Sequence, residues 1–489
     1  MSRFWISLFL PLALALRVSA VQLSLEDDRM TLSVDKTPLR EVLQSFAEHG
    51  VRVQMDPTLD VLVTGSCKST PVEEALNALL QPFGYIVTWE VVPGPVADLP
   101  RLAEIQVFQR GAPKRIAPLP PETKLHLTRG PLPNSPLFVA DEILLRVQPG
   151  TNADEFRTLL RQLGATVIGS IPELGIYQLR LPAGINVLDL VEQLKRNSLI
   201  KEVEPNYAEL IQRTPMQQVL DSPDAHSATL PHVRSSAAPL AILDSGLLGG
   251  VGLDGAVVGE YNALFPDAGM GDPQGHGTQM ALVAAGLIQP RGAAAVDEGV
   301  PLLAVRAFDE NGATSNFALM RALQYAIDKG ARVVNLSWGT ETDSRFIADA
   351  VAYAQSRGVI VVAAAGNAPT GTAMYPAAYP GVVAVSALNA DGTPWPQSNY
   401  GNFVSIAAPG TANFPIGHSG PPGNYAGTSI ASAQVSRELA LYLARNPKAT
   451  ATEAIRALQK AATDVGEAGR DPIYGYGALD AAAQAQLRK

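Results

Sequence analysis

Cysteine, runs of positive charge and long apolar stretches are all scarce in this chain of 489 residues. Cys67 is the single cysteine, so the chain cannot form an intramolecular disulfide. We expect Cys67 to behave as a small core residue, with a reactive free thiol as the alternative. The formal net charge is −9 and no Lys/Arg run occurs, which excludes the electrostatic footprint of a protein that binds nucleic acid or an anionic membrane.

Only the N-terminus carries a long apolar run. Arg3 precedes it, residues 4–16 form it, and Val18-Ser19-Ala20 then fits the small-x-small pattern of a cleavage site. This arrangement predicts a secretory signal peptide over residues 1–20. A membrane anchor is the alternative, but the run is short for a span of roughly 20 residues. We therefore expect an exported protein, periplasmic or secreted, with no membrane span once the signal is removed.

Length and composition indicate several globular domains. At roughly 100–200 residues per domain, the chain length suggests about three, and a hydrophobic fraction of 47% allows each to bury a core. Changes in composition and periodicity indicate the boundaries. After the signal we expect, in order, a small domain over 21–109, a proline-rich linker over 110–139, a second small domain over 140–210 and a large domain over 211–489.

Residues 21–109 repeat one pattern twice. In each copy a strand-like segment, alternating at 30–34 in the first copy, leads to a proline. A helix with apolar residues at helical spacing follows, and a glycine ends the helix before another strand. The prolines are Pro38 and Pro71, and the glycines are Gly50 and Gly84. The segments PLREVLQSFAEHGVRVQMDP and PVEEALNALLQPFGYIVTWE resemble the short N-terminal domain of secretins and TonB-dependent receptors. The resemblance implies a periplasmic docking or signalling module with an envelope protein partner.

Residues 140–210 have the order strand, helix, strand, strand, helix, strand, which is the ferredoxin-like plan. We expect Asn152 or Asp154 to cap the first helix. The strands are expected at 143–147, 167–171, 176–181 and 200–203, and the second helix at 187–194. The segments ILLRVQPGT, LGIYQLRLPAG and VEPNYAEL resemble the propeptide domain of subtilisin-like proteases. The resemblance implies a domain that assists folding, blocks the groove and is removed by cleavage near residues 207–214.

Residues 238–489 alternate continuous apolar runs with helical patterns. The runs fall at 240–243, 302–305, 333–334, 359–363 and 382–385. Runs without alternation suit strands that are buried on both faces of a parallel sheet, and helical patterns between them suit helices that cover those faces. The pattern predicts an α/β fold class with a doubly wound parallel sheet, whose functional loops lie at the carboxyl ends of the strands.

Four polar residues stand at such strand ends or helix starts. They are Asp244 in LAILDSG, His276 in GHGTQMALVAAG, Asn367 in VVAAAGNA and Ser429 in NYAGTSIASAQ. Each pattern alone is common in proteins where it has no catalytic role. Together they are specific, because the order Asp, His, Ser within one α/β domain, with separations of 32 and 153 residues, is the subtilisin order of the serine-hydrolase triad.

The chain resembles the subtilase family over nearly all of residues 238–489. Further matching stretches are ARVVNLSWG, YPAAYPGVVAVSAL, SNYGNFVSIAAPG and YGYGALDA. Three positions depart from the usual family pattern: Gln279 stands where the family usually has His, Ile430 where it has Met or Phe, and Ala433 where it has Pro. None of these departures removes a reacting group, so they bear on the shape of the subsites and on the start of a helix.

Acyl transfer gives each of the four residues a role. A serine hydroxyl is a poor nucleophile until a base takes its proton, so we expect His276 to accept the proton of Ser429 and pass it to the leaving amine. Asp244 would orient the imidazole and stabilise its charged form. The Asn367 side chain and the backbone N–H of Ser429 would bind the oxyanion.

By resemblance, two segments line a substrate groove. Ser337, Trp338 and Gly339 would form one wall that pairs with an extended peptide backbone, and Gly312 and Ala313 would form the facing edge. The alternative interpretation of Trp338 is a packed aromatic residue. The chemistry requires no cofactor, no metal ligands are expected, and no carboxylate cluster resembles a calcium loop, so calcium binding is possible but unsupported.

The main hypothesis is a serine endopeptidase that is made as an autoprocessed precursor and hydrolyses proteins or peptides through an acyl-enzyme. The alternative is an envelope signalling protein in which the N-terminal module binds a partner and the protease domain is a regulated effector or a scaffold. The complete set of Asp244, His276, Ser429 and Asn367 favours the first hypothesis.

Overall fold

The computed structural model describes residues 21–26, 28–111, 116–119, 124–132, 135–211, 230–266 and 268–489. The expected signal peptide, residues 1–20, lies outside the described residues, as does the end of the expected processing window, residues 212–214. The chain divides into two compact units. One holds the chain up to Val92 with Leu99–Pro121 and Leu160–Thr166, and the other holds Pro93–Asp98, Glu122–Leu159 and Val167–Lys489.

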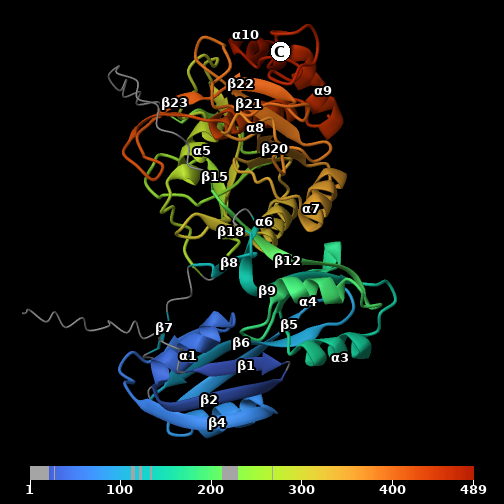
Figure 1. Ribbon diagram of the computed structural model, residues 1–489. Helices are drawn as coiled ribbons and strands as arrows, with labels where there is room; N and C mark the ends of the chain where they lie inside the picture. The colour runs from blue at the N-terminus through green and yellow to red at the C-terminus, as the bar shows by residue number, and fades with distance from the viewer. Residues whose placement is uncertain are drawn as a thin grey trace, which may run out of the picture. The chain divides into compact units, whose positions relative to one another are not determined.

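The first unit builds a core from two small sheets and two helices (Figure 1). One sheet has the strand order β1 (Gln22–Glu26), β2 (Arg29–Pro38), β4 (Leu62–Pro71). The other has the order β5 (Gly84–Val92), β6 (Leu99–Phe108), β3 (Arg52–Met55), β7 (Ala117–Pro118). Helices α1 (Leu39–Glu48) and α2 (Val72–Leu80) each begin directly after a proline, which confirms the repeated strand–helix–strand pattern.

The part of the chain expected at residues 140–210, here called the propeptide-like domain, belongs to the second unit except for Leu160–Thr166. Its elements are β9 (Leu137–Val147), α3 (Ala153–Leu163), β10 (Thr166–Ile171), β11 (Ile176–Arg180), α4 (Val187–Leu194) and β12 (Ile200–Leu210). The sheet order β10-β11-β9-β12 places the first and third strands in the middle, and the predicted order of elements is confirmed. Of the two expected caps, Asn152 is the one that accepts a hydrogen bond from a backbone N–H of the first turn of α3, that of Glu155, at 2.8 Å.

A seven-stranded parallel sheet forms the centre of the large domain. Its order is β15 (Val257–Asn262), β17 (Leu302–Arg306), β14 (Leu240–Asp244), β19 (Val333–Leu336), β20 (Ile360–Ala364), β21 (Val383–Leu388) and β22 (Ile406–Pro409). Helices α5 (His276–Ala285) and α8 (Thr428–Arg445) pack on one face, and α6 (Asn316–Asp328) and α7 (Arg345–Ser356) pack on the other. The predicted doubly wound α/β fold is confirmed.

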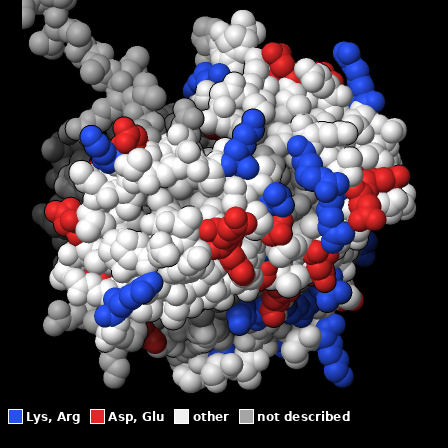
Figure 2. Space-filling model, turned by 90° about the horizontal axis from the view of Figure 1, so that it is seen from below, with Lys and Arg blue, Asp and Glu red and all other residues white. Residues whose placement is uncertain are grey.

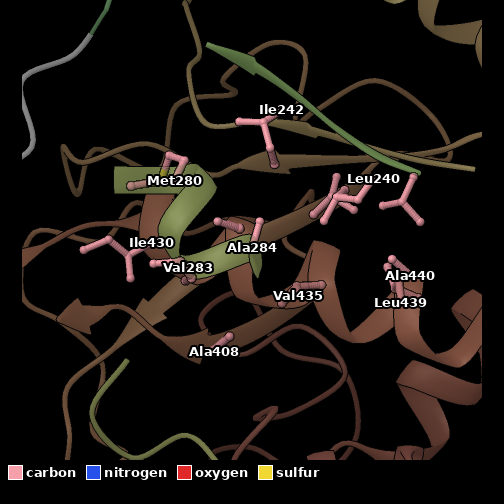
Figure 3. Packing of buried hydrophobic residues seen from close by; sticks show 14 of the residues in the cluster. Leu240, Ile242, Met280, Val283, Ala284, Ala408, Ile430, Val435, Leu439 and Ala440 are labelled. Atoms are coloured by element: carbon pink, nitrogen blue, oxygen red, sulfur yellow. The ribbon is translucent and has the colours of Figure 1, made fainter. Parts of the chain in front are cut away.

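Two hydrophobic clusters, one on each face, hold this sheet. Successive residues of β14 alternate between them: Leu240 and Ile242 belong to the cluster under α5 and α8, whereas Ala241 and Leu243 belong to the cluster under α6 and α7. This alternation explains why the strands carry continuous apolar runs. Figure 3 shows the first cluster, where side chains from β14, α5, α8 and β22 meet.

Smaller elements complete the second unit. The parallel pair β13 (His232–Val233) and β16 (Glu298–Gly299) and the hairpin β23 (Thr411–Phe414) and β24 (Gly423–Ala426) lie outside the central sheet, and helices α9 (Ala451–Ala461) and α10 (Ala481–Leu487) end the chain. The short strands β8 (Leu127–Arg129) and β18 (Ala313–Ser315) join the sheet of the propeptide-like domain. The range 110–139, expected as a linker, therefore contains β7, β8 and the start of β9.

The surface carries charges of both signs. On the face that Figure 2 presents, Lys and Arg lie among Asp and Glu without forming an extended field of one sign. Among the helices of the described residues, none is long and apolar enough to cross a membrane.

Candidate active site

Asp244 and His276 form a buried hydrogen-bonded pair at the carboxyl edge of the sheet. Asp244 is the last residue of β14, and His276 is the first residue of α5. The Nδ1 atom of His276 lies 2.7 Å from Oδ1 of Asp244, and both side chains are buried. The backbone N–H of Ser245 donates to the same carboxylate oxygen at 2.7 Å. The carboxylate therefore holds the imidazole through Nδ1, and the other ring nitrogen, Nε2, is left for another partner.

A second carboxylate, Asp272, ties the strand end to the helix start. The hydroxyl of Ser245 donates to Oδ1 of Asp272 at 2.8 Å and accepts from the backbone N–H of Gly277 at 2.8 Å. Because Ser245 follows Asp244 and Gly277 follows His276, these two bonds hold the acidic residue and the histidine in a fixed relation.

Asp272 also caps α5. The N-cap residue Gly275 has no side chain and adopts a φ of 76°, so the acceptors for the first turn must come from elsewhere. Asp272 accepts from the N–H of Gly275 at 2.9 Å and from the N–H and hydroxyl of Thr278 at 2.8 and 2.6 Å. A Cβ at Gly275 would lie 2.2 Å from the carbonyl oxygen of Gly417, so this position requires glycine.

Ser429 lies in the first turn of α8 and is buried. Its hydroxyl donates to the carbonyl oxygen of Ser337 at 2.9 Å. Within the described part of the chain, the Nε2 atom of His276 is buried and has no hydrogen-bond partner. The bond between nucleophile and base is therefore not formed in this state, and forming it requires the Ser429 hydroxyl to leave Ser337, as often happens when a substrate binds.

Asn367 lies three residues after β20, beside the start of α8. Its Oδ1 atom accepts from the backbone N–H and the hydroxyl of Thr428 at 3.0 and 2.9 Å. Among the described residues its amide nitrogen has no hydrogen-bond partner. With the oxygen engaged, the amide N–H groups are available to a ligand next to Ser429.

The residues expected at the groove edge pair with the end of β12. β12 runs antiparallel to β18, with Glu209 opposite Thr314 and Leu210 opposite Ala313. The backbone N–H of Ile211 donates to the carbonyl oxygen of Gly312 at 2.7 Å. This edge thus binds an extended backbone that belongs to the chain itself.

A cavity of about 330 Å³ lies next to this segment. Its lining includes Asn367 and Gly339 from the large domain and Glu209 from β12, together with Thr340, Glu341, Gly366, Ala208 and Leu210. Ser337 and Trp338 are not part of this lining. The indole of Trp338 is buried in the cluster under α6 and α7, where its ring centroid lies 6.2 Å from that of Phe308.

The carboxyl of Glu209 has an altered acidity in this setting. Burial raises the pKa of Glu209 from 4.5 to about 7, against the opposing effect of a hydrogen bond with Thr340. The carboxyl is therefore largely protonated in mildly acidic solution while β12 lies in the groove.

Two side chains of β12 cap helices of the large domain. Glu204 accepts from the hydroxyl of Ser344 at 2.8 Å and from the backbone N–H of Arg345 at 2.9 Å, at the start of α7. Asn206 is fully buried and accepts from the backbone N–H of Phe317 at 3.1 Å, at the start of α6. Burial raises the pKa of Glu204, and the two hydrogen bonds oppose that rise. Polar contacts thus dock β12 on the large domain.

Sequence reasoning did not find several residues of this site. Asp272 precedes the N-cap glycine of α5, so a search for acidic residues ahead of that helix could have found it. Gln279 departs from the usual family pattern, and its amide donates to the carbonyl oxygen of Ile416 at 2.7 Å. His418 has no local signal, although its ring lies 4.6 Å from that of His276. The described residues contain no group of three or more His, Cys, Asp or Glu side chains that could hold a metal ion.

Two family models match the chain. The model of the Subtilase family matches residues 237–477, and that of the Fervidolysin N-terminal prodomain matches residues 133–206. The first range includes Asp244, His276, Asn367 and Ser429. The second covers most of the propeptide-like domain.

Individual proteins are also similar to this chain. The chain is 32% identical over 313 residues to the thermophilic serine proteinase of Bacillus sp. (strain AK1), a match that covers 62% of this chain and 78% of that protein. It is 32% identical over 267 residues to subtilisin Savinase of Lederbergia lenta, covering 54% and 95%. The crystal structure of fervidolysin from Fervidobacterium pennivorans superposes with a TM-score of 0.57 at 24% identity, covering 74% of this chain and 63% of that one, and this likeness supports the fold.

Proposed function

Because this chain belongs to the subtilase family and is a serine endopeptidase made as a precursor, we propose that Asp244, His276 and Ser429 form its catalytic triad, with Asn367 as an oxyanion donor. The observation that carries this proposal is the buried 2.7 Å bond between Nδ1 of His276 and Oδ1 of Asp244, which leaves Nε2 for the nucleophile. The chemistry of a triad needs no cofactor, because the base and the nucleophile are side chains of the chain.

The reaction begins when the hydroxyl of Ser429 leaves Ser337 and donates to Nε2 of His276. His276 takes the proton while Oγ of Ser429 attacks the carbonyl carbon of the peptide bond, and Asp244 stabilises the imidazolium. The Asn367 amide and the backbone N–H of Ser429 donate to the oxyanion. His276 then protonates the leaving amine, and water hydrolyses the acyl-enzyme by the same sequence of steps.

Substrates bind as extended strands in this proposal. The pairing of β12 with β18 supports it, because residues 208–210 already lie antiparallel to Ala313–Ser315. A substrate that replaced this segment would pair with Gly312 and Ala313 on one side and with the backbone of Ser337, Trp338 and Gly339 on the other. Protein and peptide chains are therefore the proposed substrates.

The position of β12 also indicates where the precursor is cleaved during maturation. Residues 207–211 end at the groove, and the expected processing window continues to residue 214. Cleavage within 207–214 would separate the propeptide-like domain from the large domain. A mature N-terminus mapped by mass spectrometry well outside this window would contradict the proposal.

Fluorophosphonate labelling tests the triad directly. The wild type is expected to carry one label on Ser429, located by peptide mapping, and to cleave a denatured protein. Ser429→Ala should abolish both labelling and processing, whereas Ser356→Ala, which changes an exposed serine of α7, should leave both unchanged. A wild type that is active but labelled at another residue would refute the assignment.

We further propose that residues 21–109 form a docking module that directs an exported protease to an envelope partner, with the periplasm as the favoured location. Support comes from the resemblance to the short N-terminal domain of secretins and from the separate core of the first unit. Deletion of residues 21–109 should abolish co-purification with envelope proteins and leave peptide hydrolysis intact. Retained co-purification after the deletion would refute a docking role.

A further inference from the structure

A second histidine packs against the proposed general base. His418 lies in the loop between β23 and β24, and its imidazole centroid is 4.6 Å from that of His276, with the two ring planes inclined by 60°. His418 is only 4% exposed. The two imidazoles are therefore in contact inside the protein.

The loop that carries His418 is fastened to the start of α5 on both sides of His276. Ahead of His276, the backbone N–H of Ser419 donates to the carbonyl oxygen of Gln274 at 2.9 Å, and its hydroxyl donates to the Gln274 amide oxygen at 2.9 Å. After His276, the Gln279 amide donates to the carbonyl oxygen of Ile416 at 2.7 Å. Gln279 is fully buried. The position where the family usually has histidine thus holds a loop in place here.

Hydrogen bonds to Tyr425, in β24 at the end of the loop, also hold the loop in place. The hydroxyl of Tyr425 donates to the carbonyl oxygen of Pro421 at 2.6 Å and accepts from the backbone N–H of His418 at 3.2 Å. Tyr425 is itself buried in the cluster under α5 and α8. These contacts leave the His418 backbone little freedom to move away from His276.

Within the part of the chain that the structure describes, the His276 imidazole has one hydrogen bond, the one to Asp244, because Ser429 is bonded to Ser337. A single hydrogen bond fixes one ring nitrogen but permits the ring to swing about that bond. A second ring packed against it removes this freedom. Since misplacement of a catalytic group by about 1 Å can cost 10²-fold in rate, such packing matters for a base that must meet Ser429.

We propose that His418 is a positioning residue for the general base: its ring, held by the Gln279-anchored loop, keeps the His276 imidazole in the orientation that places Nε2 at Ser429. The inference rests on the proposed triad. It assigns a role to Gln279 as well, because the amide of Gln279 supports the loop and touches neither the nucleophile nor Asp244 in the described hydrogen-bond network.

Steady-state kinetics of mature full-length preparations, normalised by fluorophosphonate titration, test the proposal. His418→Ala should lower kcat by about 10²-fold with KM nearly unchanged, because the ring contact is lost and the groove is intact. His418→Phe keeps a ring at this place and should restore kcat to within about threefold of wild type.

Gln279→Ala should lower kcat by about tenfold, since it loosens the loop and leaves the ring present. The matched control His232→Ala, at an exposed histidine of β13, should behave as wild type.

Proton NMR of the Ser429→Ala precursor supplies a second readout. The low-field resonance of the proton between His276 and Asp244 should broaden or shift in the His418→Ala background and persist with His418→Phe.

The proposal is overturned if His418→Ala retains the wild-type kcat, or if His418→Phe is as impaired as His418→Ala. If the His418 variants do not fold, an unchanged kcat in Gln279→Ala overturns it. Failure of the wild type to label at Ser429 would instead refute the triad itself.

Discussion

The hydroxyl of Ser245 and the carboxylate of Asp272 are joined by a 2.8 Å hydrogen bond, which couples the strand end bearing Asp244 to the helix start bearing His276. Asp272→Asn should break this coupling, because an amide nitrogen would face backbone and hydroxyl donors in a buried site. We expect a loss of about 2–3 kcal/mol in unfolding free energy and a fall in kcat of about 10²-fold. Chemical denaturation and steady-state kinetics measure the two effects.

Asp254→Asn is the matched control for this substitution. It makes the same chemical change at an exposed aspartate of the same domain and should alter neither quantity. An Asp272→Asn enzyme with wild-type kcat and reduced stability would show that Asp272 stabilises the fold without aligning Asp244 and His276.

The Asn367 amide offers a clean test of oxyanion binding. Asn367→Asp keeps an oxygen for the two bonds from Thr428 but replaces the free N–H donors by a negative oxygen. We expect kcat to fall by at least about 10²–10³-fold, the loss measured when one such donor is removed from a subtilisin, with KM little changed. Asn402→Asp, at an exposed position, should leave both constants unchanged. A rise in KM with an unchanged kcat would place Asn367 in substrate binding instead.

The sequence predicted most of the large domain because its strands and helices are locally distinct. The apolar runs at β14, β17 and β20 correspond to strands that are buried on two faces, and Asp244 and His276 stand where such a strand ends and a helix begins. Local pattern and tertiary structure agree there, which is why order and context sufficed to identify the candidate site.

Other features depend on contacts between distant segments and have no local signal. β12 was expected only over 200–203, but it extends to Leu210 because its end pairs with β18 of the large domain. The bond of Ser429 to Ser337 and the contact of His418 with His276 likewise join segments far apart in the chain. Tertiary pairing decides such features, and no window of sequence contains both partners.

Asn206 links the stability of the precursor to the propeptide-like domain. Its side chain accepts from Phe317 at the start of α6 and donates to Glu142 at 2.7 Å. Asn206→Ala in a Ser429→Ala precursor should lower the unfolding free energy by about 1–2 kcal/mol, the usual cost of losing a helix cap. Urea unfolding measures this loss, with Asn402→Ala as an exposed control. Cleavage within 207–214 removes residue 206, so this substitution can act only in the precursor, and an unchanged unfolding free energy there would contradict the role.

The raised pKa of Glu209 predicts that the binding of β12 in the groove weakens as the pH rises. The carboxyl has a pKa of about 7 in the groove and an ordinary value of 4.5 when the segment is free. Below pH 4.5 it is protonated in both states, and the contact is strongest. Between the two values the free segment loses its proton and the bound one keeps it, so release becomes more favourable by about 1.4 kcal/mol per pH unit. Above pH 7 the equilibrium constant for binding of β12 in the groove has reached its lowest value, at most about 300-fold below the value at acidic pH.

Hydrogen exchange on the Ser429→Ala precursor checks this linkage. The protection factor of the Ile211 amide, which donates to Gly312, should fall by up to about tenfold per pH unit between pH 4.5 and 7. Glu209→Gln cannot ionise and should flatten that slope. Some slope should remain, because burial also raises the pKa of Glu204 and that carboxyl acts in the same direction. Arg129 and Glu341 also line the cavity around Glu209, so Glu341→Gln is the control for a general charge effect and should keep the wild-type slope. A wild-type protection factor that stays constant across this range would exclude Glu209 as a determinant of release.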